Sequence, residues 1–140
     1  MNTPLPAFAW PLGLAGLLPF LGGAVATALG QPWAAAALAA YGATILSFLG
    51  AVHWGLALAA PGRADLARLM GGVIPSLWAW VALLLPARPG LLMLAAGLLG
   101  LVLVESWATR RGLLPPAYLR LRWLLTVVAS GSLLAAASIT

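Results

Sequence analysis

Long apolar stretches constrain the fold of this chain more than any other feature. Of its 140 residues, 64% are hydrophobic and 6% are charged, whereas about a quarter of the residues in a typical soluble domain are charged. Seven basic and two acidic side chains cannot cover a folded domain of this size with polar groups. The bilayer must therefore cover most of the exterior, and residues 1–140 are expected to form a single membrane domain.

Five apolar runs are each long enough to cross a membrane as a helix. A helix rises about 1.5 Å per residue and the hydrocarbon core is about 30 Å thick, so about 20 residues suffice. Short breaks rich in glycine and proline separate the runs, which favours antiparallel neighbours. The sequence therefore predicts an all-α bundle of five transmembrane helices, at about 10–29, 33–60, 69–85, 91–107 and 121–139.

The basic residues, all arginines, divide unequally between the two sides of such a bundle. With five crossings, six of them share the side of the N-terminus, and only Arg88 falls on the other side. The six are Arg63, Arg68, Arg110, Arg111, Arg120 and Arg122. By the positive-inside rule, we expect a multi-pass protein of the bacterial inner membrane, with a cytoplasmic N-terminus and a periplasmic C-terminus.

The composition also limits the chemistry that we expect. The chain has no cysteine, which excludes disulfides, thiol nucleophiles and iron–sulfur ligation. The arginines lie at the ends of apolar runs, so lipid headgroups are expected as partners and nucleic acid is not. Only His53, Asp65 and Glu105 offer metal ligands, and typical sites need three or four well-placed donors. We expect no metal and no cofactor.

Small residues recur at every fourth position along the second predicted helix. The row is Ala39, Ala43, Ser47, Ala51, Gly55 and Ala59. Lipid provides no hydrophobic drive between helices, so close packing through small side chains must hold them together. The row, and its centre at Ala43, Ser47, Ala51 and Gly55 in particular, predicts a helix-packing ridge, within the chain or in a dimer.

His53, the only histidine, lies inside the same predicted helix. Ionisable residues at such depth are candidates for function. The simpler interpretation is a neutral imidazole that forms a hydrogen bond with a neighbouring helix, for which Ser76 is a candidate because it lies at a similar depth.

Glu105 lies in the last turn of the fourth predicted helix, where the helix dipole disfavours a carboxylate. One interpretation is an ion pair at the cytoplasmic rim, with Arg122 or Arg63 as partner. The alternative places Glu105 and His53 in one pocket in the cytoplasmic leaflet. His53, Ser76, Glu105 and Arg122 form the candidate polar site.

Several blocks of the sequence resemble a known family. The run from Tyr41 to Gly55, YGATILSFLGAVHWG, is the most specific, and the runs 17–20, 74–80 and 118–126 look like the remaining blocks of the family, in order. Together they resemble an uncharacterised bacterial integral membrane family that is related to mitochondrial transmembrane protein 69. Where that family usually has an aspartate, this chain has Glu105, and Ala117 replaces a common tryptophan. The resemblance implies a membrane location and does not indicate any particular activity.

Two functions are compatible with these features. The first is a structural or accessory subunit that packs against a larger inner-membrane complex, respiratory or photosynthetic, or self-associates through the small-residue ridge. The second is a lipid- or quinone-binding protein or small carrier, with a site around His53 and Glu105 in the cytoplasmic leaflet. No pair of titratable groups with a demonstrated shared pocket supports catalysis, so we expect no enzyme.

Overall fold

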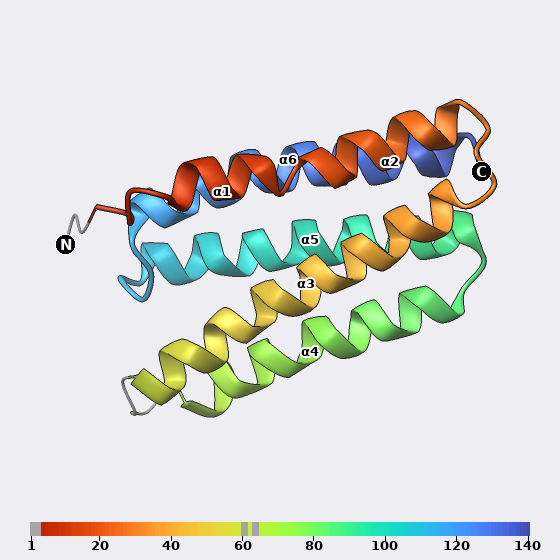
Figure 1. Ribbon diagram of the computed structural model, residues 1–140. Coiled ribbons are helices and arrows are strands. Elements are labelled where there is room, and N and C mark those ends of the chain that lie inside the picture. Colours follow the sequence, from red (N-terminus) through yellow and green to blue (C-terminus); the bar gives the residue numbers. More distant parts are fainter. Residues whose placement is uncertain (1–3, 60–61, 63–64) are drawn as a thin grey trace.

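The computed structural model describes residues 4–59, 62 and 65–140, and these residues form helices joined by short loops (Figure 1). The helices are α1 (Ala9–Ala15), α2 (Leu18–Ala28), α3 (Ala34–Ala59), α4 (Asp65–Leu84), α5 (Ala87–Arg110) and α6 (Pro116–Ser138). Within the described residues, five spans are long and apolar enough to cross a membrane, with α1 and α2 together forming the first. The predicted five-helix fold class is confirmed.

The spans form one bundle in which α5 and α6 lie side by side (Figure 1). Helices α1 and α2 follow each other in line along α6, while α3 runs obliquely across the bundle and α4 packs along it. The most extensive contacts join α3 to α4 and α5 to α6. Because α3 also contacts α2, α5 and α6, it connects the two halves of the bundle.

The first span, predicted at about 10–29, is broken into two helices next to Pro19, a residue that tends to kink a helix. Helix α1 ends at Ala15 and α2 begins at Leu18, one residue before Pro19. Proline has no N–H to donate, so a helix that reaches it loses a backbone hydrogen bond. The Tyr41 hydroxyl of α3 donates to the Gly16 carbonyl at the break, over 2.8 Å. A neighbouring helix thus satisfies a carbonyl exposed by the break.

The last three helices begin four or five residues earlier than predicted, and α5 also ends three residues later. Helix α5 begins at Ala87 and includes Pro89 in its first turn, and α6 begins at Pro116. Proline fits the first turn because the N–H groups there have no partner within the helix. The apolar runs marked the membrane-spanning segments correctly, but the helices continue into more polar sequence at their ends.

Two glycines end helices as the turn chemistry of the sequence suggests. Gly30 after α2 and Gly112 after α5 have φ of 74° and 72°, a left-handed conformation that glycine adopts without steric cost. After α2, the N–H of Gly30 donates to Thr27 and that of Gln31 to Ala26. These are the two bonds of a Schellman motif, and equivalent bonds follow α5.

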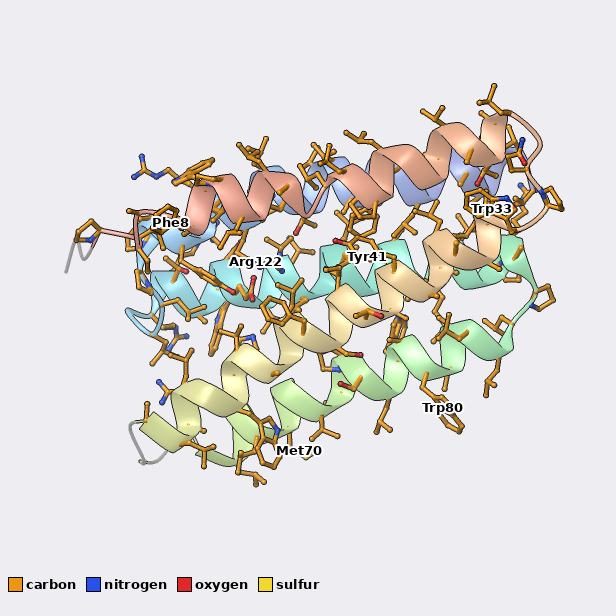
Figure 2. The ribbon with its side chains drawn as sticks, viewed as in Figure 1. Phe8, Trp33, Tyr41, Met70, Trp80 and Arg122 are labelled. Carbon is orange, nitrogen blue, oxygen red and sulfur yellow. The ribbon has the colours of Figure 1, made fainter. Side chains whose placement is uncertain are left out.

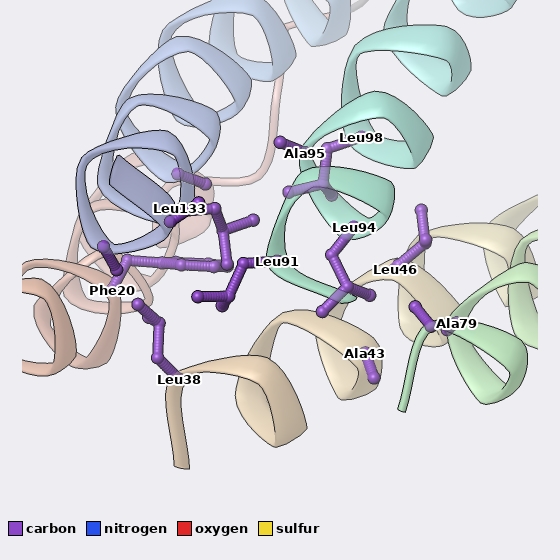
Figure 3. Packing of buried hydrophobic residues seen from close by; sticks show 14 of the residues in the cluster. Phe20, Leu38, Ala43, Leu46, Ala79, Leu91, Leu94, Ala95, Leu98 and Leu133 are labelled. Atoms are coloured by element: carbon purple, nitrogen blue, oxygen red, sulfur yellow. The ribbon is translucent and has the colours of Figure 1, made fainter. Parts of the chain in front are cut away.

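Large apolar side chains fill the centre of the bundle where α2, α3, α5 and α6 meet (Figure 3). Phe20, Leu91 and Leu133 are at most 2% exposed and gather there. Helices α3 and α4 approach more closely than side chains would allow, because a Cβ at Gly50 would lie 2.6 Å from the Gly72 carbonyl oxygen. Glycine therefore sets the contact between these two backbones.

Candidate functional site

Three of the four predicted polar residues lie together inside the bundle. Glu105 projects from α5, His53 from α3 and Arg122 from α6. The Arg122 Nε donates to Glu105 Oε2 over 2.8 Å, and His53 Nε2 lies 3.5 Å from Glu105 Oε1. The side chains of Glu105, Arg122 and His53 are 0%, 3% and 12% exposed. The carboxylate is therefore at the centre of a buried cluster.

The fourth predicted residue, Ser76, is half-buried on α4. Within the described part of the chain, no hydrogen bond joins Ser76 to His53. The imidazole instead faces Glu105. His53 and Glu105 are therefore in contact, with Arg122 as a third member of the cluster, but neither His53 nor Glu105 lines a cleft among the described residues.

Glu105 lies deeper than its predicted position in the last turn of a helix. The helix continues to Arg110, so the carboxylate lies more than one turn before the end. Its partner is Arg122, one of the two arginines predicted, while the other, Arg63, lies outside the described residues. The ion pair is buried between helices rather than exposed at a rim, and each charge depends on the other because an unpaired buried charge is strongly unfavourable.

A polar row on α6, at every fourth residue, completes the cluster. Its members are Tyr118, Arg122, Thr126 and Ser130. The Arg122 Nη1 donates to Thr126 Oγ1 over 3.3 Å. The Tyr118 hydroxyl lies close enough to Glu105 and Arg122 to interact with both, although neither contact has the geometry of a full hydrogen bond. The four-residue spacing, which puts side chains on one helix face, is the sequence signal that would have identified Tyr118 and Thr126.

Several polar atoms of the cluster are buried without a hydrogen-bond partner. They are His53 Nε2, Glu105 Oε1, Tyr118 Oη, Arg122 Nη2 and Ser130 Oγ. Unsatisfied polar groups in an apolar interior are costly, and most proteins contain few of them. His53 Nε2 and Glu105 Oε1 face each other over 3.5 Å, whereas Tyr118 Oη and Arg122 Nη2 lie one helical turn apart and are candidates for partners supplied by a bound molecule.

A cleft of about 370 Å³ opens beside the cluster. It lies between α1, α2, α3 and α6, and its walls are mostly apolar, including Phe20, Phe48 and Leu125. Tyr118, Arg122 and Thr126 supply the polar part of the lining. Figure 2 shows Arg122 between the helices, whereas Met70 and Trp80 point away from the bundle. The arrangement can hold an apolar chain and present hydrogen-bond donors to a polar group at its end.

The predicted packing ridge divides between the inside and the outside of the bundle. Ala43 is buried and Ser47 is half-buried, but Ala51 and Gly55 are exposed. The close approach to α4 is made by Gly50, which lies beside the ridge. A second, apolar groove of about 440 Å³ runs over α4 and α5, where Gly71 and Gly100 leave open space.

Comparison with known proteins identifies the family of this chain. Residues 5–138 match the profile of a family described as "Protein of unknown function (DUF3429)". The chain is 44% identical to transmembrane protein 69 of Xenopus tropicalis over 88 residues, which are 59% of this chain and 34% of that protein. It is 33% identical to transmembrane protein 69 of Mus musculus over 93 residues, which are 63% of this chain and 37% of that protein.

The chain thus spans about a third of the length of these curated relatives. No solved structure matches it significantly. The family profile covers nearly the whole chain, from the residue after Pro4 to the end of α6. The resemblance of its sequence blocks indicated the same family. The chain therefore belongs to this family of membrane proteins of unknown function.

Proposed function

We propose that this protein binds an amphipathic small molecule, a lipid or a quinone, taken up from the membrane. Its apolar part would occupy the cleft between α1, α2, α3 and α6, and its polar end would meet Tyr118, Arg122 and Thr126. One observation carries this proposal. The side chain of Arg122 is 3% exposed, lines an otherwise mostly apolar cleft and keeps one guanidinium nitrogen without a hydrogen-bond partner.

The size and composition of the cleft support binding. Small-molecule sites are about 300–1,000 Å³, mostly apolar, with a few polar groups that orient the ligand, and the cleft has about 370 Å³. Ionisable residues inside a membrane bundle commonly mark such sites. We propose binding rather than catalysis, because the charges of Glu105 and Arg122 are engaged in pairing with each other.

Native mass spectrometry of the full chain, purified in a mild detergent, tests this proposal. We expect one retained amphiphile per protein molecule. The variant Val52→Trp should lose it, because Val52 lines the cleft and the indole would fill the space. Leu58→Trp is the matched control on the same helix, since Leu58 is 73% exposed and lies outside the cleft. Equal retention by both variants, or no retained molecule in the unmodified protein, would contradict the proposal.

A second candidate function is that of an accessory subunit whose surface receives a helix of another membrane protein. The groove over α4 and α5 supports it, because Gly71 and Gly100 leave room for a backbone to approach. The exposed Ala51 and Gly55 offer a further small-residue surface on α3.

Crosslinking in native membranes tests this second function. A photoreactive amino acid at Gly100 should give a defined adduct with one membrane protein or with a second copy of the chain. The same residue at Leu92 is the control, since Leu92 is exposed on α5 and lies outside the groove. Adducts with lipid alone at Gly100 would count against an accessory role.

A further inference from the structure

Two hydrogen-bond donors on the α6 wall of the cleft have no acceptor. Arg122 Nη2 and Tyr118 Oη are both buried and without a hydrogen-bond partner. Their side chains line the same cleft and lie one helical turn apart. A ligand whose polar end accepts hydrogen bonds would satisfy both donors.

The charge of Arg122 is already matched within the protein. Its Nε lies 2.8 Å from the carboxylate of Glu105, which is fully buried. An anionic headgroup beside this pair would bring a second negative charge close to Glu105, and like charges in surroundings of low polarity repel strongly. The remaining titratable neighbour, His53, faces Glu105 and does not line the cleft. A neutral headgroup therefore fits the cleft better than an anionic one.

Among neutral headgroups, the donors favour a carbonyl. A carbonyl oxygen has two lone pairs and no proton that would need an acceptor of its own. The unpartnered carboxylate oxygen of the cluster, Glu105 Oε1, belongs to a residue that does not line the cleft. An ammonium head would therefore bring charged donors that the cleft does not match.

We propose that the ligand presents a neutral carbonyl oxygen to Arg122 Nη2 and the Tyr118 hydroxyl, as an isoprenoid quinone or a glyceride ester would. This inference rests on the proposed function and names the ligand class of the same site. Thr126 contributes indirectly, since its hydroxyl accepts from Arg122 Nη1 and so helps to hold the guanidinium against the cleft wall.

Binding of three probes to the full chain in detergent tests the inference. The probes are a decyl-substituted benzoquinone, dioctanoylglycerol and dioctanoyl phosphatidic acid, each measured by equilibrium dialysis. The two glycerides share acyl chains and differ by the phosphate. We expect the quinone or dioctanoylglycerol to bind at least about tenfold more tightly than phosphatidic acid, and the preferred probe identifies the source of the carbonyl.

The variant Tyr118→Phe separates binding from folding. Loss of one hydrogen bond should weaken binding of the preferred neutral probe about fivefold. The unfolding temperature should stay nearly the same, because no contact of the Tyr118 hydroxyl within the protein has the geometry of a full hydrogen bond. Tyr41→Phe is the matched control with the opposite pattern, since the Tyr41 hydroxyl bonds Gly16 and lies outside the cleft lining.

The outcomes distinguish this inference from the proposed function. Phosphatidic acid that binds as tightly as the neutral probes overturns the requirement for a neutral headgroup and leaves amphiphile binding intact. No binding of any probe overturns both. A lower unfolding temperature for Tyr118→Phe, with unchanged probe affinity, shows that the hydroxyl is structural and overturns its role as a donor to the ligand.

Discussion

At the scale of single residues, the buried ion pair of Glu105 and Arg122 is the feature that most needs a physical account. Both side chains are almost completely buried. Removing each charge from water costs several kcal/mol, and the attraction between the two charges offsets about this much when their geometry is good. Such a pair is therefore weak evidence for stability. Its value here lies in holding Arg122 rigidly at the wall of the cleft.

A double-mutant cycle tests the dependence of the two charges on each other. Glu105→Met and Arg122→Met should each lower the free energy of unfolding by about 3–5 kcal/mol, because each leaves one buried charge unpaired. The double variant should be close to the unmodified protein, since two apolar side chains replace the pair. Additive losses, measured by thermal unfolding in detergent, would show that the two residues do not interact.

The hydroxyl of Tyr41 makes a second residue-scale contribution, at the break in the first span. Tyr41→Phe should lower the free energy of unfolding by about 1 kcal/mol, because the Gly16 carbonyl loses its donor. The edge-to-face contact of the ring with Phe20 would remain. Thr44→Val is the control, since Thr44 is exposed and bonds its own helix at Ala40. Equal effects of the two variants would contradict this account of the break.

Residue types allowed part of the site to be predicted. His53, Glu105 and Arg122 are conspicuous because charged or titratable groups are rare in apolar helices. Hydroxyl residues do not stand out in the same way, because in apolar helices they usually donate to the backbone carbonyl four residues earlier, as Thr27 and Ser132 do. Thr126 instead accepts from Arg122, a contact that depends on tertiary structure.

At the scale of elements, the apolar runs predicted the spans well because the thickness of the bilayer sets their length. Pro19 indicates a bend in the first span, but the sequence did not reveal that Tyr41 of α3 stabilises the break. The four-residue row on α3 likewise defined a face without identifying what it contacts. Gly50, outside that row, makes the closest approach to α4.

Replacement of two glycines on α3 tests this packing. Gly50→Ala should destabilise the protein by about 1–3 kcal/mol, because its Cβ would lie 2.6 Å from the Gly72 carbonyl oxygen. Gly55→Ala should be neutral or stabilising by up to about 1 kcal/mol, because nothing lies within 4 Å of its Cβ and alanine favours helix. Thermal unfolding of both variants in the same detergent makes the comparison. A Gly50→Ala variant as stable as Gly55→Ala would contradict the close approach.

At the scale of the whole molecule, the bundle has two different ends. The start of α1 and the end of α6 lie at opposite ends (Figure 1). The loop between α5 and α6 follows Arg110 and Arg111, and the loop between α2 and α3 has no charged residue. The prediction that the arginine-rich end is cytoplasmic follows from this distribution and the positive-inside rule.

Single cysteines test that orientation cleanly, because the chain has none. Leu113→Cys and Gln31→Cys place thiols at exposed positions in loops at opposite ends of the bundle. In intact cells, a membrane-impermeant maleimide should label Gln31→Cys and should reach Leu113→Cys only after the membrane is opened. The reverse pattern would invert the orientation.

We propose that the cleft beside Arg122 holds the polar end of an amphiphile. Photocrosslinking with a quinone or diglyceride that carries a diazirine near its polar end tests this binding mode, with the adducts mapped by peptide mass spectrometry. We expect adducts on cleft residues of α6 and α3, such as Leu121 and Val52, and their loss when unlabelled ligand is added in excess. Adducts concentrated in the groove of α4 and α5, or spread evenly over the lipid-facing surface, would contradict it.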